Sequence, residues 1–280
     1  MTRIRVYNYE LEHYSPMIHP EDYFDTSDWE FRDLFEEAEL VWEILPRIKP
    51  YLQDRVRPNV QALLAQGSFL TRTSVLYKGE LIQDDLRLAP GDATKGSFRV
   101  FHRDRELAGA VVLYGGVTLA GPDIFLGEGT VVESGAFLQG PTFIGRCTEV
   151  RQGAYLRGGC LVGDHCVVGH VTEMKNSILL NGAKAGHFAY IGDSILGNHC
   201  NLGAGTKLAN LKIIRSAVTV QTAKEKYDTG LRKFGVILGD RTETGCNSVT
   251  SPGTLLGPRS IVGANVTVKA GVYPPRSVLR

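Results

Sequence analysis

The stretch GEGTVV-ESGAFL-QGPTFI-GRCTEV-RQGAYL-RGGCLV-GDHCVV, residues 127–168, repeats with a period of six. Each hexad closes on an aliphatic residue, and the same spacing runs back to Leu126 and forward through GHVTEM and KNSILL to Leu180. An amphipathic helix would need apolar residues about every 3.6 positions and a strand every second position, so neither explains the pattern. A period of six with Gly, Asn or Asp at the turns is typical of a parallel β-helix, in which three hexads close one triangular coil.

The repeat changes register twice along the chain. The second register follows Leu180 by ten residues where twelve are expected, and it runs through Tyr190, Leu196, Leu202, Leu208 and Ile214. This slip predicts that the coil is interrupted at residues 181–190. The third register runs through Leu238, Thr244, Thr250, Leu256, Val262 and Val268. Between these two registers, the basic segment 213–235 lacks the repeat and is expected to leave the prism as a loop or hairpin.

The part of the chain before the repeat, positions 1–110, follows other patterns and contains only five of the 32 glycines. After the capping sequence DTSD (25–28), apolar residues recur at helical spacing from Phe31 to Leu45. This spacing predicts one amphipathic helix, whose stripe with Trp42 packs on a neighbouring element or on another subunit. Residues 68–114 alternate apolar stretches with glycine and charge. We therefore expect a mainly β protein with a helical segment at 1–66, a mixed β lead-in at 67–115 and a β-helix at 116–280.

Composition narrows the function. The formal net charge of +1 gives no electrostatic reason to expect a nucleic-acid or membrane partner. No apolar run approaches the roughly 18 residues of a membrane span, and the N-terminus has no signal-peptide pattern. The five cysteines show no CxxC spacing, so neither a disulfide framework nor a zinc site is expected. These features predict a cytoplasmic protein without a bound metal.

Polar residues gather in the stretch 169–212. Arg157 and Lys175 are separated by three hexads, one coil of the predicted prism, so they would line one face and could clamp a phosphate. The alternative is that both cations are simply solvated. His187 lies close to Tyr190 at the predicted register break, where an imidazole could exchange a proton with a substrate. A histidine satisfied within a loop is the other interpretation, and His170 is a weaker candidate.

These residues resemble a known family. G-H-V-T-E-M-K (169–175), G-A-K-A-G-H-F-A-Y-I-G-D (182–193) and N-L-G-A-G-T (201–206) are similar to the acetyltransferase domain of the bifunctional glucosamine-1-phosphate acetyltransferase/N-acetylglucosamine-1-phosphate uridyltransferase, and to the same domain of archaeal sugar-phosphate nucleotidylyltransferases. The similarity covers roughly residues 120–272. It implies a left-handed parallel β-helix, a homotrimer with sites between neighbouring prisms, and acetyl-CoA as co-substrate.

The resemblance also implies roles for individual residues. His187 would be the base that takes a proton from the amine of the sugar. Arg157 and Lys175 would hold the sugar phosphate, while Tyr190 and Asn201 would place the sugar and Asn210 would bind nearby. The backbone N–H of Ala204 would face the acetyl carbonyl, and Cys246 and Ala264 would contact coenzyme A.

The predicted function is acetyl transfer from acetyl-CoA to the amine of a hexosamine 1-phosphate in amino-sugar nucleotide synthesis. The glycine-rich L-x-x-G-x-G-T-x-M loop of the nucleotidylyltransferase domain is absent, so uridylyl transfer is not expected. Position 170 is His where the bifunctional enzymes usually have Asn. Two alternatives stay open: a non-catalytic sugar-nucleotide-binding or assembly module whose front helix docks a separate nucleotidylyltransferase, and an acyltransferase with another acceptor or acyl donor.

Overall fold

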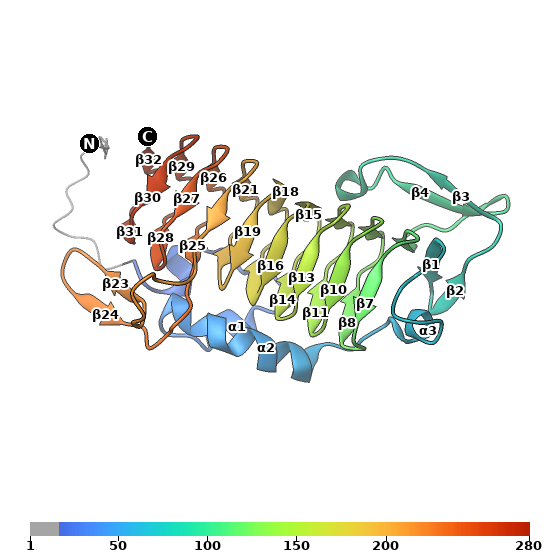
Figure 1. The fold of residues 1–280 in the computed structure, drawn as a ribbon, viewed down its shortest axis with the longest axis horizontal. Helices are drawn as coiled ribbons and strands as arrows, with labels where there is room; N and C mark the ends of the chain where they lie inside the picture. The colour runs from blue at the N-terminus through green and yellow to red at the C-terminus, as the bar shows by residue number, and fades with distance from the viewer. Residues whose placement is uncertain (1–16) are drawn as a thin grey trace.

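The computed structural model describes residues 17–280, and most of this chain winds into an elongated three-sided prism (Figure 1). Each coil contributes one short strand to each of three parallel sheets. The first sheet contains β6 (Val111–Leu113), β9 (Val131–Val132), β12 (Glu149–Val150), β15 (Val167–His170), β18 (Lys184–His187), β21 (Asn201–Leu202), β26 (Glu243–Thr244), β29 (Ile261–Val262) and β32 (Val278–Leu279).

The other two sheets repeat the same order along the prism. The second sheet contains β7 (Thr118–Ala120), β10 (Phe137–Gln139), β13 (Tyr155–Arg157), β16 (Glu173–Lys175), β19 (Tyr190–Gly192), β22 (Lys207–Leu208), β27 (Val249–Thr250) and β30 (Thr267–Val268). The third sheet contains β8 (Ile124–Leu126), β11 (Thr142–Ile144), β14 (Cys160–Val162), β17 (Ser177–Leu179), β20 (Ile195–Leu196), β25 (Val236–Leu238), β28 (Thr254–Leu256) and β31 (Gly271–Tyr273).

One inward side chain per strand fills the prism, which confirms the period-six interpretation. The predicted aliphatic residues from Leu126 to Met174 are buried and stack in register on the adjacent coils. The third predicted register is also confirmed, with the inward hydroxyl side chains of Thr244 and Thr250 continuing two of the stacks. The chain therefore has the left-handed parallel β-helix fold expected from its sequence.

The register slip lies earlier than predicted, and it shortens a corner rather than interrupting the coil. Met174 and Leu179 are successive inward residues with four residues between them, whereas five separate Leu156 from Val162. Leu179 thus takes the inward place predicted for Leu180, and Leu180 packs outside the third sheet. By the same shift Ile191 points inward instead of Tyr190.

The two coils that follow this corner are each one residue shorter than three full hexads, and coils of three full hexads return between Leu238 and Val268. Val168 pairs with Ala185, and Ile191 pairs with Leu208, each one position sooner than Val150 pairs with Val168. The predicted interruption at 181–190 is therefore wrong. Ile214 is also not part of a stack, since it is 79% exposed in the segment that leaves the prism.

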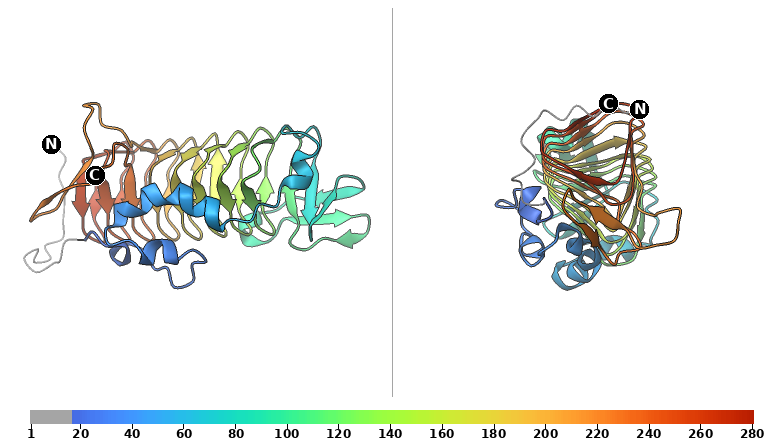
Figure 2. Two further views of the ribbon diagram at one scale, coloured as in Figure 1. Left: turned by 90° about the horizontal axis from the view of Figure 1, so that it is seen from below. Right: turned by 90° about the vertical axis from the view of Figure 1, so that its left-hand side faces the viewer.

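The N-terminal segment covers the outer face of the third sheet (Figure 2). The continuous helix predicted from Phe31 to Leu45 is wrong. The segment instead forms η2 (Pro20–Asp22), α1 (Asp33–Glu36), η3 (Val41–Glu43) and α2 (Ile44–Arg55). Both Glu39 and Leu40 donate backbone N–H bonds to the Glu43 carboxylate, which fixes a new start just before α2. Proline is tolerated at position 46 because the first turn has no N–H partners to lose.

The predicted apolar stripe is nevertheless buried, and it packs on the chain's own prism. Phe31, Trp42 and Leu45 belong to one apolar cluster with the outward residues of the third sheet, including Phe143, Leu161 and Ile178. The Phe31 and Phe143 rings meet edge to face with their centroids 4.7 Å apart. One of the three prism faces is thus closed by this chain and unavailable to a partner.

Smaller elements lie at the two ends of the prism (Figure 1). At the end where the coils begin are α3 (Gln61–Leu64), β1 (Ser74–Tyr77), β2 (Glu80–Ile82), β3 (Leu86–Ala89), η4 (Ala93–Lys95), β4 (Arg99–His102) and β5 (Arg105–Glu106). At the other end, the segment that leaves the prism forms an antiparallel hairpin of β23 (Thr219–Gln221) and β24 (Lys226–Asp228). No helix among residues 17–280 has the length and apolar character needed to cross a bilayer.

Candidate functional site

Four of the predicted site residues occupy one edge of the prism. We call this the histidine edge: the corner between the first and second sheets at residues 169–172, 186–189, 203–206, 245–248 and 263–266. Strand pairing of Ala185 with Leu202, Leu202 with Thr244 and Thr244 with Val262 places His187, Ala204, Cys246 and Ala264 at equivalent positions of successive coils. Adjacent strands are about 4.8 Å apart, so these residues form a line about 14 Å long.

The histidine edge is accessible along this line. His187, Cys246 and Ala264 are exposed, and Ala204 is partly exposed. Among the described residues, the backbone N–H of Ala204 donates no hydrogen bond, although its carbonyl accepts one from Asn247 N at 2.8 Å. An unpaired N–H one coil above an imidazole is a suitable donor for an oxygen that gains negative charge during a reaction.

A second histidine stands directly beside the first. His170 and His187 are register partners on β15 and β18. The His170 Nδ1 atom lies 2.9 Å from the carbonyl oxygen of Gln152, and the His170 ring meets the Phe188 ring edge to face at 5.2 Å. A coil of three full hexads would stack position 188 on position 170, so counting hexads could not predict that the two histidines are partners.

Most of the predicted phosphate and sugar ligands form a polar cluster on the second sheet. Arg157 Nη1 lies 2.6 Å from Glu173 Oε1, and Lys175 Nζ lies 3.1 Å from both carboxylate oxygens of Asp193. Both predicted clamp cations therefore have a carboxylate partner within the chain. A phosphate bound there would have to compete with Glu173 and Asp193 for the same charges.

Asp193 holds the polar cluster together, and its place there was not predicted from the sequence. The Asp193 side chain is 7% exposed, and it accepts hydrogen bonds from Lys175, Asn176 and Asn210. The Asn176 amide also donates to Leu45 O at 3.2 Å, which ties the cluster to α2. An Asp next to a turn glycine gives no sequence signal of this role, because corner positions are commonly Asn or Asp for conformational reasons alone.

Tyr190 connects the polar cluster to the histidine edge. It starts β19, three residues after His187, and its hydroxyl lies 3.3 Å from Asn210 Oδ1. Partial burial, followed by the negative charges of Glu173 and Asp193, raises the pKa of Tyr190 above its ordinary value. The hydroxyl is therefore a hydrogen-bond donor at neutral pH rather than a phenolate.

Asn201 is the predicted ligand that the monomer does not bring to the cluster. It begins β21 on the outer surface of the first sheet, between Lys184 and Glu243 in the strand ladder, and it is exposed. The single chain thus divides the predicted site among the first sheet, the histidine edge and the second sheet.

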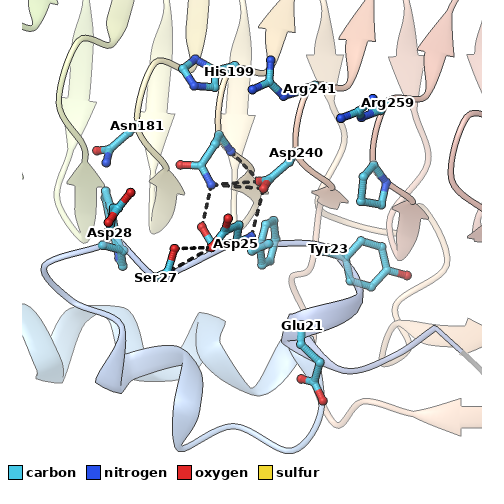
Figure 3. A pocket seen from close by; sticks show the side chains of 14 residues that line it. Glu21, Tyr23, Asp25, Ser27, Asp28, Asn181, His199, Asp240, Arg241 and Arg259 are labelled. Carbon is cyan, nitrogen blue, oxygen red and sulfur yellow. Dashed lines mark hydrogen bonds between the residues drawn. The ribbon is translucent and has the colours of Figure 1, made fainter.

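A groove with a volume of about 720 Å³ lies at a different edge of the prism, between the third and first sheets. Figure 3 shows Asp25, Ser27 and Asp28 of the N-terminal segment on one wall and His199, Arg241 and Arg259 of successive coils on the other. Asp240 accepts hydrogen bonds from Asp25 N and Asn198 N at its floor. These bonds attach the N-terminal segment to the prism, and none of the predicted site residues lines this groove.

The cysteines differ in surroundings. Burial raises the pKa of Cys160, Cys166 and Cys200 to about 12, and their thiols point to backbone carbonyls inside the prism. Cys246 is exposed on the histidine edge. Within residues 17–280, no three His, Cys, Asp or Glu side chains are grouped as metal ligands would be.

Known proteins share parts of this chain. The GMPPB C-terminal domain family matches residues 138–224. The bifunctional protein GlmU of Methanococcus vannielii is 38% identical over 101 residues, which is 36% of this chain and 24% of that protein. The putative uncharacterized acetyltransferase YaiX of Escherichia coli K12 is 33% identical over 161 residues, which is 56% of this chain and 70% of that protein.

The match to the bifunctional relative spans about a quarter of that relative's length. Among solved structures, the UDP-N-acetylglucosamine acyltransferase of Francisella novicida is 13% identical with a TM-score of 0.38, covering 61% of this chain and 68% of that one.

The hexapeptide coils and the sequence similarity to GlmU place this chain in the class of left-handed β-helix proteins that includes acetyltransferase domains. Within that class, the chain belongs to the same family as the putative uncharacterized acetyltransferase YaiX of E. coli.

Proposed function

We propose that the chain transfers the acetyl group of acetyl-CoA to the amine of a hexosamine 1-phosphate, with His187 as the general base. The observation that carries the proposal is the line of His187, Ala204, Cys246 and Ala264 along the histidine edge. An extended cofactor bound along this line would place its thioester near Ala204 and His187. Coenzyme A would occupy the coils toward Ala264.

The chemistry needs few groups. His187 accepts a proton from the attacking amine and returns it to the departing thiol, and a positioned general base typically contributes about 10²–10⁴-fold. The free N–H of Ala204 donates to the oxyanion of the tetrahedral intermediate. Tyr190, Asn210 and the polar cluster orient the sugar beside the edge. No metal is required for any of these steps.

We further propose that the active form is a homotrimer. Phe188 is 54% exposed, Val171 is 50% exposed and Tyr155 is 41% exposed, so apolar side chains surround the histidine edge in the single chain. Asn201, on the first sheet, would approach the substrate from a neighbouring prism. Packing of two prisms at this edge would bury these side chains and complete the pocket around the acceptor. A cytoplasmic location remains a prediction from the sequence.

The experiment is a thiol-release assay with acetyl-CoA and glucosamine 1-phosphate. We expect activity in the wild type and a loss of about 10²-fold or more in His187→Ala. His199→Ala is the matched control, because His199 is also an exposed corner histidine but lies on the edge between the third and first sheets. Equal activity of wild type and His187→Ala would remove His187 as the base.

A second candidate has the same chemistry with an acceptor that carries no phosphate. The contacts of Arg157 with Glu173 and of Lys175 with Asp193 favour it, because both cations are already neutralised. Glu173 would then accept hydrogen bonds from sugar hydroxyls. Comparing glucosamine with glucosamine 1-phosphate separates the two candidates. Tight binding of a sugar nucleotide without any turnover would instead indicate a non-catalytic assembly module.

A further inference from the structure

His170 holds its ring in one defined orientation. Its Nδ1 atom lies 2.9 Å from the Gln152 carbonyl oxygen, which can only accept a hydrogen bond. Nδ1 must therefore carry the hydrogen in the neutral ring, and Nε2 is left with a free lone pair. Carbonyl anchoring of one ring nitrogen is the usual way in which a protein fixes a histidine tautomer. By contrast, the His187 imidazole makes no hydrogen bond within residues 17–280.

The two rings are placed to serve the same small volume. His170 and His187 are partners across adjacent strands, so their backbones are about 4.8 Å apart. Phe188 contacts both, with ring centroids 5.2 Å from His170 and 6.1 Å from His187. An amine bound beside Phe188 would have one imidazole on each coil within reach.

An amine acceptor has to lose two protons in this reaction. It reaches the enzyme largely as an ammonium ion, because an amine next to an electron-withdrawing carbon titrates near pH 8, as an α-amino group does. One proton must leave before the nitrogen has a lone pair for attack. The second leaves after the C–N bond has formed. A hydroxyl acceptor would need only one of these transfers.

We propose, on the basis of the proposed function above, that His170 is a second catalytic base that deprotonates the incoming ammonium. The N–H bond of the ammonium breaks and an Nε2–H bond forms on His170, which later releases this proton to water. The amine lone pair then attacks the thioester carbon, and the carbonyl pair moves to oxygen. His187 takes the second proton and gives it to sulfur as the C–S bond breaks. The products are the amide, the free thiol and one proton in solution.

The acidic side chains around His170 and His187 pair with arginines and not with the two imidazoles. On the strand below His170, Glu149 and Arg151 pair with each other at 2.8 Å, and across the corner Glu173 pairs with Arg157 at 2.6 Å. On the strand above, Lys184 precedes His187 and has no ion pair in the described part of the chain. Neither imidazole has a carboxylate partner among residues 17–280. Both imidazoles are therefore open to a bound amine.

The test is the pH profile of kcat/KM for His170→Asn and His187→Asn, measured by thiol release. Asn at position 170 can still donate to the Gln152 carbonyl but cannot accept the ammonium proton. At pH 6.5, where about 3% of an amine with a pKa near 8 is unprotonated, we expect His170→Asn to lose about 30-fold. At pH 9, where most of the acceptor is already free amine, the loss should fall to about twofold. His187→Asn should be impaired by a similar factor at both pH values.

Unfolding midpoints and solution masses of both variants confirm that each is folded and assembled as the wild type is. A His170→Asn profile that runs parallel to the wild-type profile, with or without a constant loss, would overturn the role of His170 while leaving acetyl transfer intact. A wild type that acetylates neither glucosamine nor glucosamine 1-phosphate would overturn the proposed function, and the role of His170 with it.

Discussion

Two glycines on the histidine edge should respond very differently to the same substitution. Gly169 and Gly186 lie at the same position of consecutive coils, each directly before one of the two edge histidines. A Cβ on Gly169 would lie 1.9 Å from the Gly186 carbonyl oxygen and 2.1 Å from its carbonyl carbon. A Cβ on Gly186 would meet no atom within 4 Å. Neither glycine has a left-handed φ, so the two differ in contact and not in backbone conformation.

The magnitude follows from what has to move. Ordinary van der Waals contact of a Cβ is about 3.4–4 Å, so Gly169→Ala must push the neighbouring coil away by more than 1 Å. Overpacking of this kind costs about 1–3 kcal/mol. The backbone hydrogen bond from Phe188 N to His170 O, 2.8 Å long, would be lost or weakened, which would cost about 1 kcal/mol of stability. We expect a total loss of about 3 kcal/mol, or about 6–12 °C in Tm.

The assay is thermal unfolding of Gly169→Ala and Gly186→Ala in parallel with the wild type. Gly186→Ala should be neutral or slightly stabilising, by about 0.4–1 kcal/mol, because alanine restricts the unfolded chain. Gly169→Ala should also reduce acetyl transfer well below its melting temperature, since the displaced coil carries His187. Equal melting temperatures for the two variants would refute the close approach of these coils and the stacking of the two histidines.

Three further predictions test other parts of the structure. Asp193→Ala leaves the Lys175 ammonium, whose side chain is 23% exposed, without its carboxylate partner, and should lower the free energy of unfolding in urea by about 3 kcal/mol. The control Glu36→Gln, which breaks the exposed pair with Arg32, should cost less than about 1 kcal/mol. Equal costs for the two variants would contradict the buried network. A thiol reagent at pH 8 should label the exposed Cys246 first, and acetyl-CoA should slow this labelling. Cys160, Cys166 and Cys200 should react only after unfolding, because thiols with a pKa of about 12 remain protonated at pH 8. Labelling of Cys246 at the same rate with and without acetyl-CoA would argue against cofactor contact. Burial raises the pKa of Asp240, so the stabilising contribution of this carboxyl is complete below the pKa of the unfolded carboxyl and is lost as pH rises through the folded pKa. When the pH is lowered from 7 to 4, the Tm of the wild type should therefore rise relative to that of Asp240→Asn. A Tm difference that does not depend on pH would show that the carboxyl is solvated.

The prism could be predicted from the sequence because the six-residue repeat follows from the path of the backbone around each coil. Every inward residue from Leu126 to Met174 could be assigned by counting sixes, since each coil must place one side chain per sheet in the interior. Counting failed only where a corner lost a residue. Leu179 and Leu180 are both leucine, so the sequence offered no contrast to show which of them points inward.

The N-terminal segment was harder to predict for a related reason. Its stripe from Phe31 to Leu45 has helical spacing, and those side chains are indeed buried. Burial, however, is imposed by the flat outer face of the third sheet, on which short helical turns can present the same side chains as one continuous helix. The capping of the new start by Glu43 depends on a local carboxylate geometry that periodicity does not contain.

The shortened corner also explains why the arrangement of the candidate site could not be predicted from the sequence. In a coil of three full hexads, position 188 would stack on position 170, and a phenylalanine would stand where the base is needed. Because the coil is one residue shorter, His187 stacks on His170, and Ala204 falls on the next coil of the same line. The same shift turns Tyr190 outward, next to Asn210 and Asp193. One residue fewer at a corner thus converts a uniform prism into an edge with two stacked imidazoles and an adjacent polar cluster, which is the arrangement that the proposed transfer to an amine would use.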